Sequence, residues 1–160
     1  MSFTICQADL KNPNHQLAIV QLLDMYCRDA MGGGKPLADD SRARLIPALQ
    51  SRSDTLILLA FSDGKPVGLC TCFEGFSTFM AKPLLNVHDL AVHPAHRGRG
   101  IGRSLLMEAE TLACESGYCK LTLEVRADNP GAQHLYRSLG FAELTPVMHF
   151  WNKTLPPENS

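Results

Sequence analysis

The stretch HRGRGIGRSLL, residues 96–106, is the feature that most constrains how this chain folds. Its alternating glycines (Gly98, Gly100 and Gly102) follow the apolar run LLNVHDLAV and overlap the start, at Ile101, of an amphipathic stretch. Glycine adopts positive φ and lets a backbone approach a ligand closely, and a helix N-terminus offers unpaired N–H groups. The pattern predicts a strand, a tight turn and a helix whose N-terminus holds a phosphate. A plain strand-to-helix turn with no ligand is the alternative.

Two other phosphate-binding motifs do not fit these glycines. The P-loop needs G-x-x-x-x-G-K-[ST], and no Lys-Ser/Thr follows them, while GGGKP at Gly32 lacks the hydroxyl residue. The dinucleotide fingerprint G-x-G-x-x-G needs a glycine three places after the second one. Counted from Gly98 that position is Arg103, and counted from Gly100 it is Leu105. Both motifs are therefore excluded.

Hydrophobic periodicity and turn residues predict one α/β domain over residues 1–160. SDGK, residues 62–65, is typical of a hairpin turn, and FSTFMAK, residues 76–82, indicates a looser connection. Asp39 and Asp40 are expected to cap a helix that Pro47 kinks or shortens. The expected strands are 3–8, 55–61, 66–74, 84–92, 120–126 and 146–155, and the expected helices are 14–30, 39 to about 50, 101 to just before Gly117, and 130–139.

Composition and charge exclude several classes of protein. The formal net charge is −1 and no long basic tract occurs, so nothing favours a nucleic-acid partner. No apolar run reaches the roughly 20 residues that cross a bilayer, so no membrane partner is expected. The six cysteines are scattered without a CxxC pair; Cys70 and Cys72 share one strand face. With no signal peptide, reduced thiols in the cytoplasm are the expectation.

Two blocks of sequence, in order, resemble the GNAT superfamily of acetyl-CoA-dependent N-acetyltransferases. Arg97, Gly100 and Gly102 match the R-x-x-G-x-G turn of that family, and NPGAQHLYRSLGF, from Asn129, matches its second block. The spermidine/spermine N-acetyltransferase branch is the most similar. The resemblance implies an α/β (α+β) fold with a mixed, mostly antiparallel sheet of six or seven strands. About four helices flank that sheet, and a splayed parallel strand pair binds the cofactor.

The resemblance also implies how acetyl-CoA is held. The pantetheine arm lies like an extra strand along the backbone of Leu90, Ala91 and Val92, next to a strand from which theirs diverges. Asn129 and Ala132, at the start of the next helix, lie near the cofactor. The pyrophosphate is bound by the turn residues Arg97, Gly98, Arg99, Gly100, Ile101, Gly102 and Arg103.

Tyr136 matches the family's general acid toward the departing thiolate, although a half-buried helix tyrosine is the commoner role of such a residue. His88 is the first candidate for the general base because histidine titrates near neutrality; a packed histidine is the alternative. Period two places His88 and Asp89 on opposite faces of their strand, so at most one of them lines the cleft. Asp89, Glu74 and Glu124 are the other candidate bases.

The predicted activity is transfer of an acetyl group from acetyl-CoA to a primary amine of a small molecule. The alternatives are a protein or peptide N-acetyltransferase and a non-catalytic acetyl-CoA-binding regulatory module. No metal is expected, because the spacing of His88, His93 and His96 fits no known pattern. MGGGKP, residues 31–36, is either a substrate lid or a flexible turn. Phe73, Phe76 and Phe79 are either core or contacts of a homodimer, a state common in similar proteins.

Overall fold

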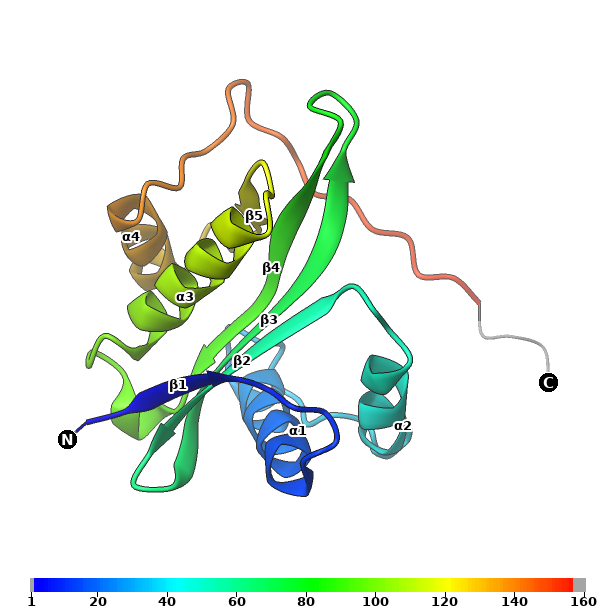
Figure 1. The fold of residues 1–160 in the computed structure, drawn as a ribbon, viewed down its shortest axis with the longest axis vertical. Helices are drawn as coiled ribbons and strands as arrows, with labels where there is room; N and C mark the ends of the chain where they lie inside the picture. The colour runs from blue at the N-terminus through cyan, green and yellow to red at the C-terminus, as the bar shows by residue number, and fades with distance from the viewer. Residues whose placement is uncertain (1, 157–160) are drawn as a thin grey trace.

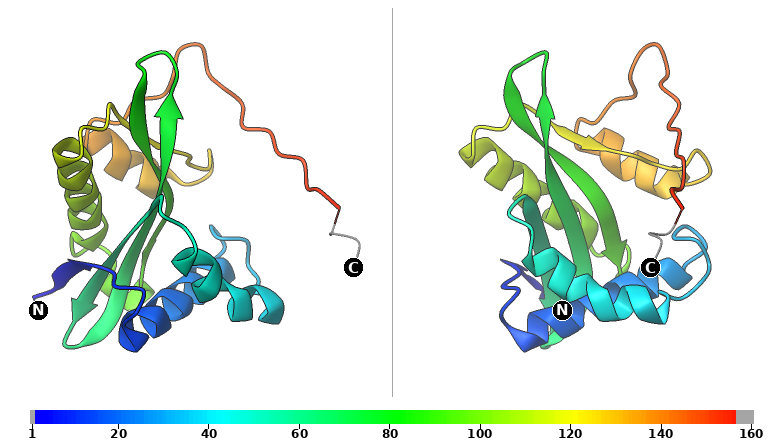
Figure 2. Two further views of the ribbon diagram at one scale, coloured as in Figure 1. Left: turned by 45° about the vertical axis from the view of Figure 1, so that its right-hand side comes forward. Right: turned by 90° about the vertical axis from the view of Figure 1, so that its right-hand side faces the viewer.

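In the computed structural model, which describes residues 2–156, a five-stranded sheet separates two layers of helices (Figure 1). Helices α1 and α2 cover one face of the sheet, while α3 and α4 lie on the other (Figure 2). The strand order is β1-β2-β3-β4-β5, antiparallel except for the parallel pair β4 and β5. The elements are β1 (Thr4–Gln7), α1 (Pro13–Arg28), α2 (Asp39–Gln50), β2 (Thr55–Ser62), β3 (Lys65–Ser77), β4 (Lys82–Val92), a 3₁₀ turn η1 (Pro94–His96), α3 (Ile101–Glu115), β5 (Leu121–Leu123) and α4 (Pro130–Ser138).

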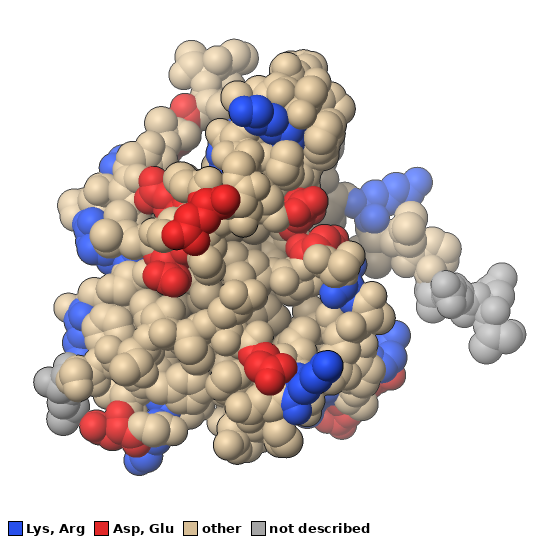
Figure 3. Space-filling model, in the orientation of Figure 1, with Lys and Arg blue, Asp and Glu red and all other residues tan. Residues whose placement is uncertain are grey.

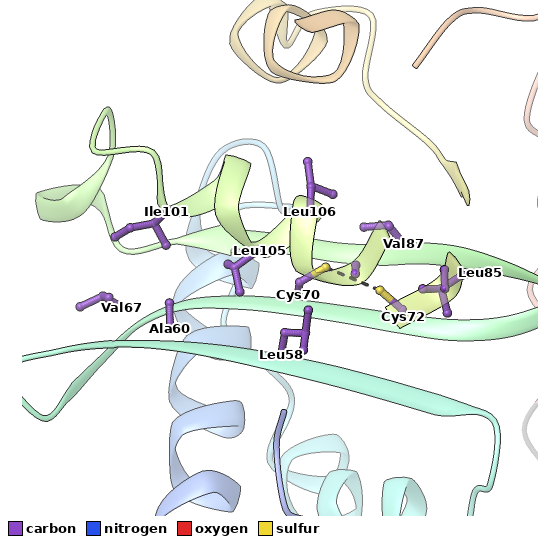
Figure 4. Close-up of a cluster of buried hydrophobic side chains, with 12 residues drawn as sticks. Leu58, Ala60, Val67, Cys70, Cys72, Leu85, Val87, Ile101, Leu105 and Leu106 are labelled. Carbon is purple, nitrogen blue, oxygen red and sulfur yellow. Dashed lines mark hydrogen bonds between the residues drawn. The ribbon is translucent and has the colours of Figure 1, made fainter. Parts of the chain in front are cut away.

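The core consists of two apolar clusters, one on each face of the sheet. Because side chains alternate along a strand, Leu58 of β2 packs toward α3 while its neighbour Leu59 packs toward α1. Figure 4 shows the α3-side cluster, in which the sulfur atoms of Cys70 and Cys72 lie 3.6 Å apart. Their expected location on one face is confirmed. Burial on both faces explains why the central strands are almost continuously apolar.

The expected ends of α3 and α4 are confirmed. Helix α3 follows Gly100, whose φ is 83°, and stops before Gly117, whose φ is 74°. These left-handed conformations favour glycine. The side chain of Asn129 caps α4 by accepting a hydrogen bond from the Ala132 N–H at 3.1 Å.

The expected bounds of α2 are confirmed, whereas the predicted effects of Pro47 and of Asp39 and Asp40 need correction. Pro47 does not end this helix, which continues to Gln50. Ala38 occupies the N-cap and gives no side-chain cap, so Asp39 and Asp40 lie inside the first turn instead. There they still favour the helix, because the N-terminal end of the helix dipole is positive.

The predicted six or seven strands are reduced to five among the described residues. The predicted loose connection at 76–82 was wrong at both ends. Residues 76 and 77 belong to β3 and residue 82 begins β4, so the two strands form one long hairpin. The predicted strand 120–126 pairs only over Leu121–Leu123. Residues 146–155 form no strand, and the side chain of Trp151 is 86% exposed. A strand needs a neighbour for its N–H and C=O groups, and three paired residues of β5 offer this segment little edge.

The surface agrees with the near-neutral formal charge. Basic and acidic side chains are interspersed on the face shown in Figure 3, with no continuous basic surface on that face. Phe76 and Phe79 at the tip of the long hairpin are exposed, so they are not core residues, whereas Phe73 packs against the α1-side cluster. Among residues 2–156, no helix is long and apolar enough to cross a membrane.

Candidate functional site

The site is built on the divergence of β4 and β5. The two parallel strands pair at Leu85–Leu121, Asn86–Thr122 and Val87–Leu123. Strand β4 then continues to Val92, whereas β5 ends at Leu123. The edge of β4 that faced β5 therefore has no strand partner from His88 onward, although its Val92 carbonyl accepts a hydrogen bond from Arg97 Nε at 3.1 Å. Such an edge can accept an extended ligand as an added strand.

A cleft of about 660 Å³ opens at this divergence. Leu90, Ala91 and Val92 lie along one wall, and Glu124, Val125 and Arg126 lie along the other. Most residues that the sequence proposed for the site border the same cleft. They are His88, Leu90, Ala91, Val92, Arg97, Gly98, Gly100, Ile101, Gly102, Arg103, Asn129, Ala132 and Tyr136.

The glycine turn presents backbone amides to one end of this cleft. Gly98 and Gly100 have φ of 74° and 83°, and a Cβ built on either would meet no atom within 4 Å. The first amide that bonds back within α3 is that of Ser104, to the Gly100 carbonyl at 2.9 Å. The preceding amides of the helix have no partner inside it. Converging amides at the positive end of a helix form an anion-binding concavity.

Tyr136 borders the cleft from α4. Its ring contacts Phe141 with centroids 5.9 Å apart, and the side chain is half-buried. Burial, with smaller contributions from Tyr26 and Cys70, raises the pKa of Tyr136 to about 12. The phenol therefore keeps its proton at neutral pH, as a proton donor must.

A β-bulge places His88 in the cleft. Val87 pairs with Cys72 and Asp89 pairs with Thr71, so His88 is an extra residue on β4. The His88 ring packs edge-on against Phe73, on the α1 side of the sheet, with centroids 5.4 Å apart.

The bulge also overturns the expectation that His88 and Asp89 lie on opposite faces. Leu90 packs against the α3-side cluster, so its neighbour Asp89 points to the α1 side of the sheet, as His88 does. Strict alternation fails because a bulge adds one residue without a partner. His88 borders the cleft, whereas Asp89 is not among the residues that line it.

Three further candidates lie in different places. Glu124 borders the cleft. Glu74 lies outside the cleft lining and accepts a hydrogen bond from the Tyr118 hydroxyl, which favours a structural role. Arg99 is exposed and is not among the residues that border the cleft.

The end of α1 also lines the cleft, a contribution that no motif in the sequence predicted. Met25, Tyr26, Asp29 and Met31, at the end of this helix and just after it, border the cleft. The one sequence signal for this part of the site was MGGGKP, residues 31–36, which was expected to be either a substrate lid or a flexible turn. That connection is a hydrogen-bonded turn, in which the Gly32, Gly33 and Gly34 amides bond to the Asp29 carbonyl.

Among residues 2–156, no group of three or more His, Cys, Asp or Glu side chains could hold a metal ion. The cleft instead combines an anion cradle, an open strand edge, an imidazole and a protonated phenol. These groups can hold a long phosphorylated ligand at one end and move protons at the other.

The comparison with protein families matches residues 19–141 to the acetyltransferase (GNAT) family. An uncharacterised N-acetyltransferase of Methanocaldococcus jannaschii is 33% identical over 96 residues, 59% of this chain and 42% of the relative. The N-alpha-acetyltransferase MAK3 of Arabidopsis thaliana is 35% identical over 60% of this chain and 50% of the relative. An aminoglycoside N(6')-acetyltransferase of Acinetobacter haemolyticus is 30% identical over 61% of this chain and 70% of the relative. The chain thus spans half or less of the first two relatives.

Solved structures of similar fold cover nearly the whole chain. A crystal structure of a probable acetyltransferase has a TM-score of 0.78 and 26% identity, and the match covers 98% of this chain and 99% of that one. The structure of AAC(6')-Iy in complex with a CoA-containing bisubstrate analogue has a TM-score of 0.77 and 18% identity, and the match covers 97% of this chain and 100% of that one. The second match shows likeness of fold alone.

We expect Asp89→Asn to stabilise the protein at neutral pH but not in acid. Burial raises the pKa of the Asp89 carboxyl above its ordinary value of 3.8, against the smaller opposing effects of His88 and Thr71. The folded state therefore disfavours the carboxylate, and wild-type stability falls as pH rises from 3.8 through the folded-state pKa. Asparagine carries no such charge. Urea unfolding at several pH values should show a stability difference that is absent below pH 3.8 and grows above it. A difference that is constant with pH contradicts the assignment.

Proposed function

Because the chain belongs to the GNAT family of acetyltransferases, we propose that it transfers the acetyl group of acetyl-CoA to a primary amine of a small molecule. One observation carries the proposal: the glycine turn, the open edge of β4, His88 and Tyr136 all border the same cleft. A long thioester substrate needs both kinds of group, an anion cradle for its phosphates and proton-transfer groups for its reacting end.

The cofactor-binding part of the proposal uses backbone groups. The amides at the N-terminus of α3 hold the pyrophosphate, with Arg97 and Arg103 nearby on the cleft wall. The backbone of Leu90, Ala91 and Val92 pairs with the amide groups of the pantetheine arm, where β5 has ended. When bound, acetyl-CoA supplies an activated thioester.

The residues at the other end of the cleft then move two protons. His88 accepts the proton that the amine loses as its nitrogen bonds to the acetyl carbon. The N–H of Leu90 donates a hydrogen bond to the acetyl oxygen while that oxygen carries negative charge. Tyr136 donates its proton to the thiolate that forms when the carbon–sulfur bond breaks.

The acceptor end is bordered by Met25, Tyr26 and Met31 from the α1 side and by Glu124 after β5. This mixed apolar and acidic lining, in a cleft of limited volume, supports a small amine. The relatives include enzymes named for aminoglycosides and for protein N-termini, so they support different acceptors. Membership of the spermidine/spermine branch stays a prediction.

Replacing Gly100 with valine should weaken binding of coenzyme A at least about 10-fold, the equivalent of roughly 1.4 kcal/mol. A β-branched residue is strained at a φ of 83°, so the turn must reorganise and its amides no longer converge. Isothermal titration calorimetry measures the affinity, and the milder Gly100→Ala variant serves if valine prevents folding.

Gly64→Val is the matched control. Gly64 has a φ of 73° and open space around it, as Gly100 does, but it lies in the β2–β3 turn outside the cleft. This variant should lose stability and keep the affinity for coenzyme A. Wild-type affinity in folded Gly100→Val would reject the pyrophosphate assignment.

Tyr136→Phe should lower kcat by about 10²–10⁴-fold, because phenylalanine keeps the ring and removes the proton donor. The KM for acetyl-CoA should change little. The measurement is thiol release with a panel of spermidine, kanamycin, lysine and an N-terminal peptide. Tyr118→Phe is the control, since the Tyr118 hydroxyl donates to Glu74 outside the cleft lining.

The same panel separates the alternative functions. Turnover confined to the peptide would favour a protein N-acetyltransferase. Binding of acetyl-CoA with no turnover of any amine would favour a regulatory binding module. Equal rates for wild type and Tyr136→Phe would remove the general-acid role of Tyr136.

His88→Ala should lower the rate and flatten its dependence on pH. A general base acts only in its unprotonated form, so removing the base also removes the part of the pH dependence of kcat/KM that the base causes. Stopped-time assays between pH 5.5 and about 9, at saturating acetyl-CoA, record both profiles. An unchanged profile in the variant would transfer the base role to Glu124, the candidate carboxylate that also borders the cleft.

A further inference from the structure

Asp29, directly after α1, makes contacts to both sides of the cleft. One carboxylate oxygen, Oδ2, accepts a hydrogen bond from Arg97 Nη2 at 2.7 Å. The other, Oδ1, accepts from the Met31 N–H at 2.9 Å. The Asp29 carbonyl accepts from three successive glycine amides, those of residues 32–34, at 2.9–3.1 Å. One residue thus contacts both the glycine turn of the phosphate end and the turn of the acceptor end.

The acceptor-side turn, residues 29–34, fits closely against the end of α1. A Cβ at position 32 would lie 1.9 Å from the Tyr26 carbonyl oxygen, so only glycine fits there. The Lys35 amide bonds back to the Cys27 carbonyl at 3.1 Å. This turn carries Met31, which borders the cleft. A change at Asp29 therefore reaches an acceptor-side residue.

Arg97 provides the other half of the connection. Its Nε donates to the Val92 carbonyl at 3.1 Å, at the end of β4, while Nη2 reaches Asp29. The Arg97 side chain is 52% exposed and that of Asp29 22% exposed, so this is a surface ion pair that adds little to global stability. Arg97 also borders the cleft. A ligand that immobilises the phosphate end therefore immobilises the partner of Asp29.

We propose that Asp29 is a positioning residue that couples binding of coenzyme A at the glycine turn to ordering of the acceptor-side turn at residues 29–34. The inference rests on the proposed use of the cleft for coenzyme A. An anion on the α3 amides fixes the loop that carries Arg97. Arg97 then holds the Asp29 carboxylate, which holds the backbone that presents Met31. Coupling of this kind is reciprocal, so an acceptor bound against the turn favours coenzyme A equally.

The test is hydrogen exchange with coenzyme A itself as the probe, because it requires no knowledge of the acceptor. In the wild type, saturating coenzyme A should slow exchange in peptides covering residues 90–104 and, by about 5-fold or more, in peptides covering 29–35. Asp29→Asn keeps a carbonyl oxygen for the Met31 amide and removes the charge that pairs with Arg97. It should retain the slowing at 90–104 and lose it at 29–35.

Asp40→Asn is the matched control. It removes the same charge from an Asp–Arg pair, with Arg44, on the exposed surface of α2 and outside the cleft lining. Slowing in both segments should persist in this variant. Loss of slowing at 29–35 in Asp40→Asn would contradict the specific role of Asp29.

The outcomes separate this inference from the proposed function. Slowing at 90–104 without slowing at 29–35 in the wild type overturns the coupling and leaves the proposed function standing. Slowing at 29–35 that persists in Asp29→Asn overturns the role of Asp29 alone. No slowing in either segment overturns the cofactor assignment and the inference with it.

Discussion

The divergence of β4 from β5 after the Val87–Leu123 pair is the constraint on which the rest of the site depends. If the two strands stayed paired, the backbone of Leu90 would be bonded within the sheet and no cleft would lie between the wall of β4 and residues 124–126. The divergence leaves a row of backbone donors and acceptors open beside the N-terminus of α3. The strand edge and the helix N-terminus border the same cleft.

The bulge at His88 is the second structural feature that shapes the site. It brings His88 into the cleft and turns Asp89 toward α1, while the residues beyond it regain their packing against α3. A single unpaired residue thus supplies an imidazole near the open strand edge at little cost to the core. It also places a carboxylate behind the imidazole, where burial raises its pKa. Bulges commonly re-aim side chains next to active sites.

Local sequence signals predicted the elements well where the signal itself is local. The cap of α4 by Asn129 and the positive φ at Gly100 and Gly117 follow from residue chemistry at single positions. Strand pairing was harder to predict, because it depends on a distant partner. The segment 146–155 has an apolar strand-like composition but no pairing in the sheet, and β5 is shorter than its alternating sequence indicates.

The sequence by itself determined the turn before α3: alternating glycines ahead of an amphipathic helix allow the positive φ of Gly98 and Gly100 and leave the first amides of the helix without a partner inside it. It also located Tyr136 in its helix, through the cap and the Gly-Phe that follows. Only the tertiary structure decided which groups meet across the cleft. The bulge at His88 and the bond between Asp29 and Arg97 join residues through register and through packing of α1. The sequence spacing of 68 residues between that pair carries no signal of contact, because long-range contacts arise from the whole fold.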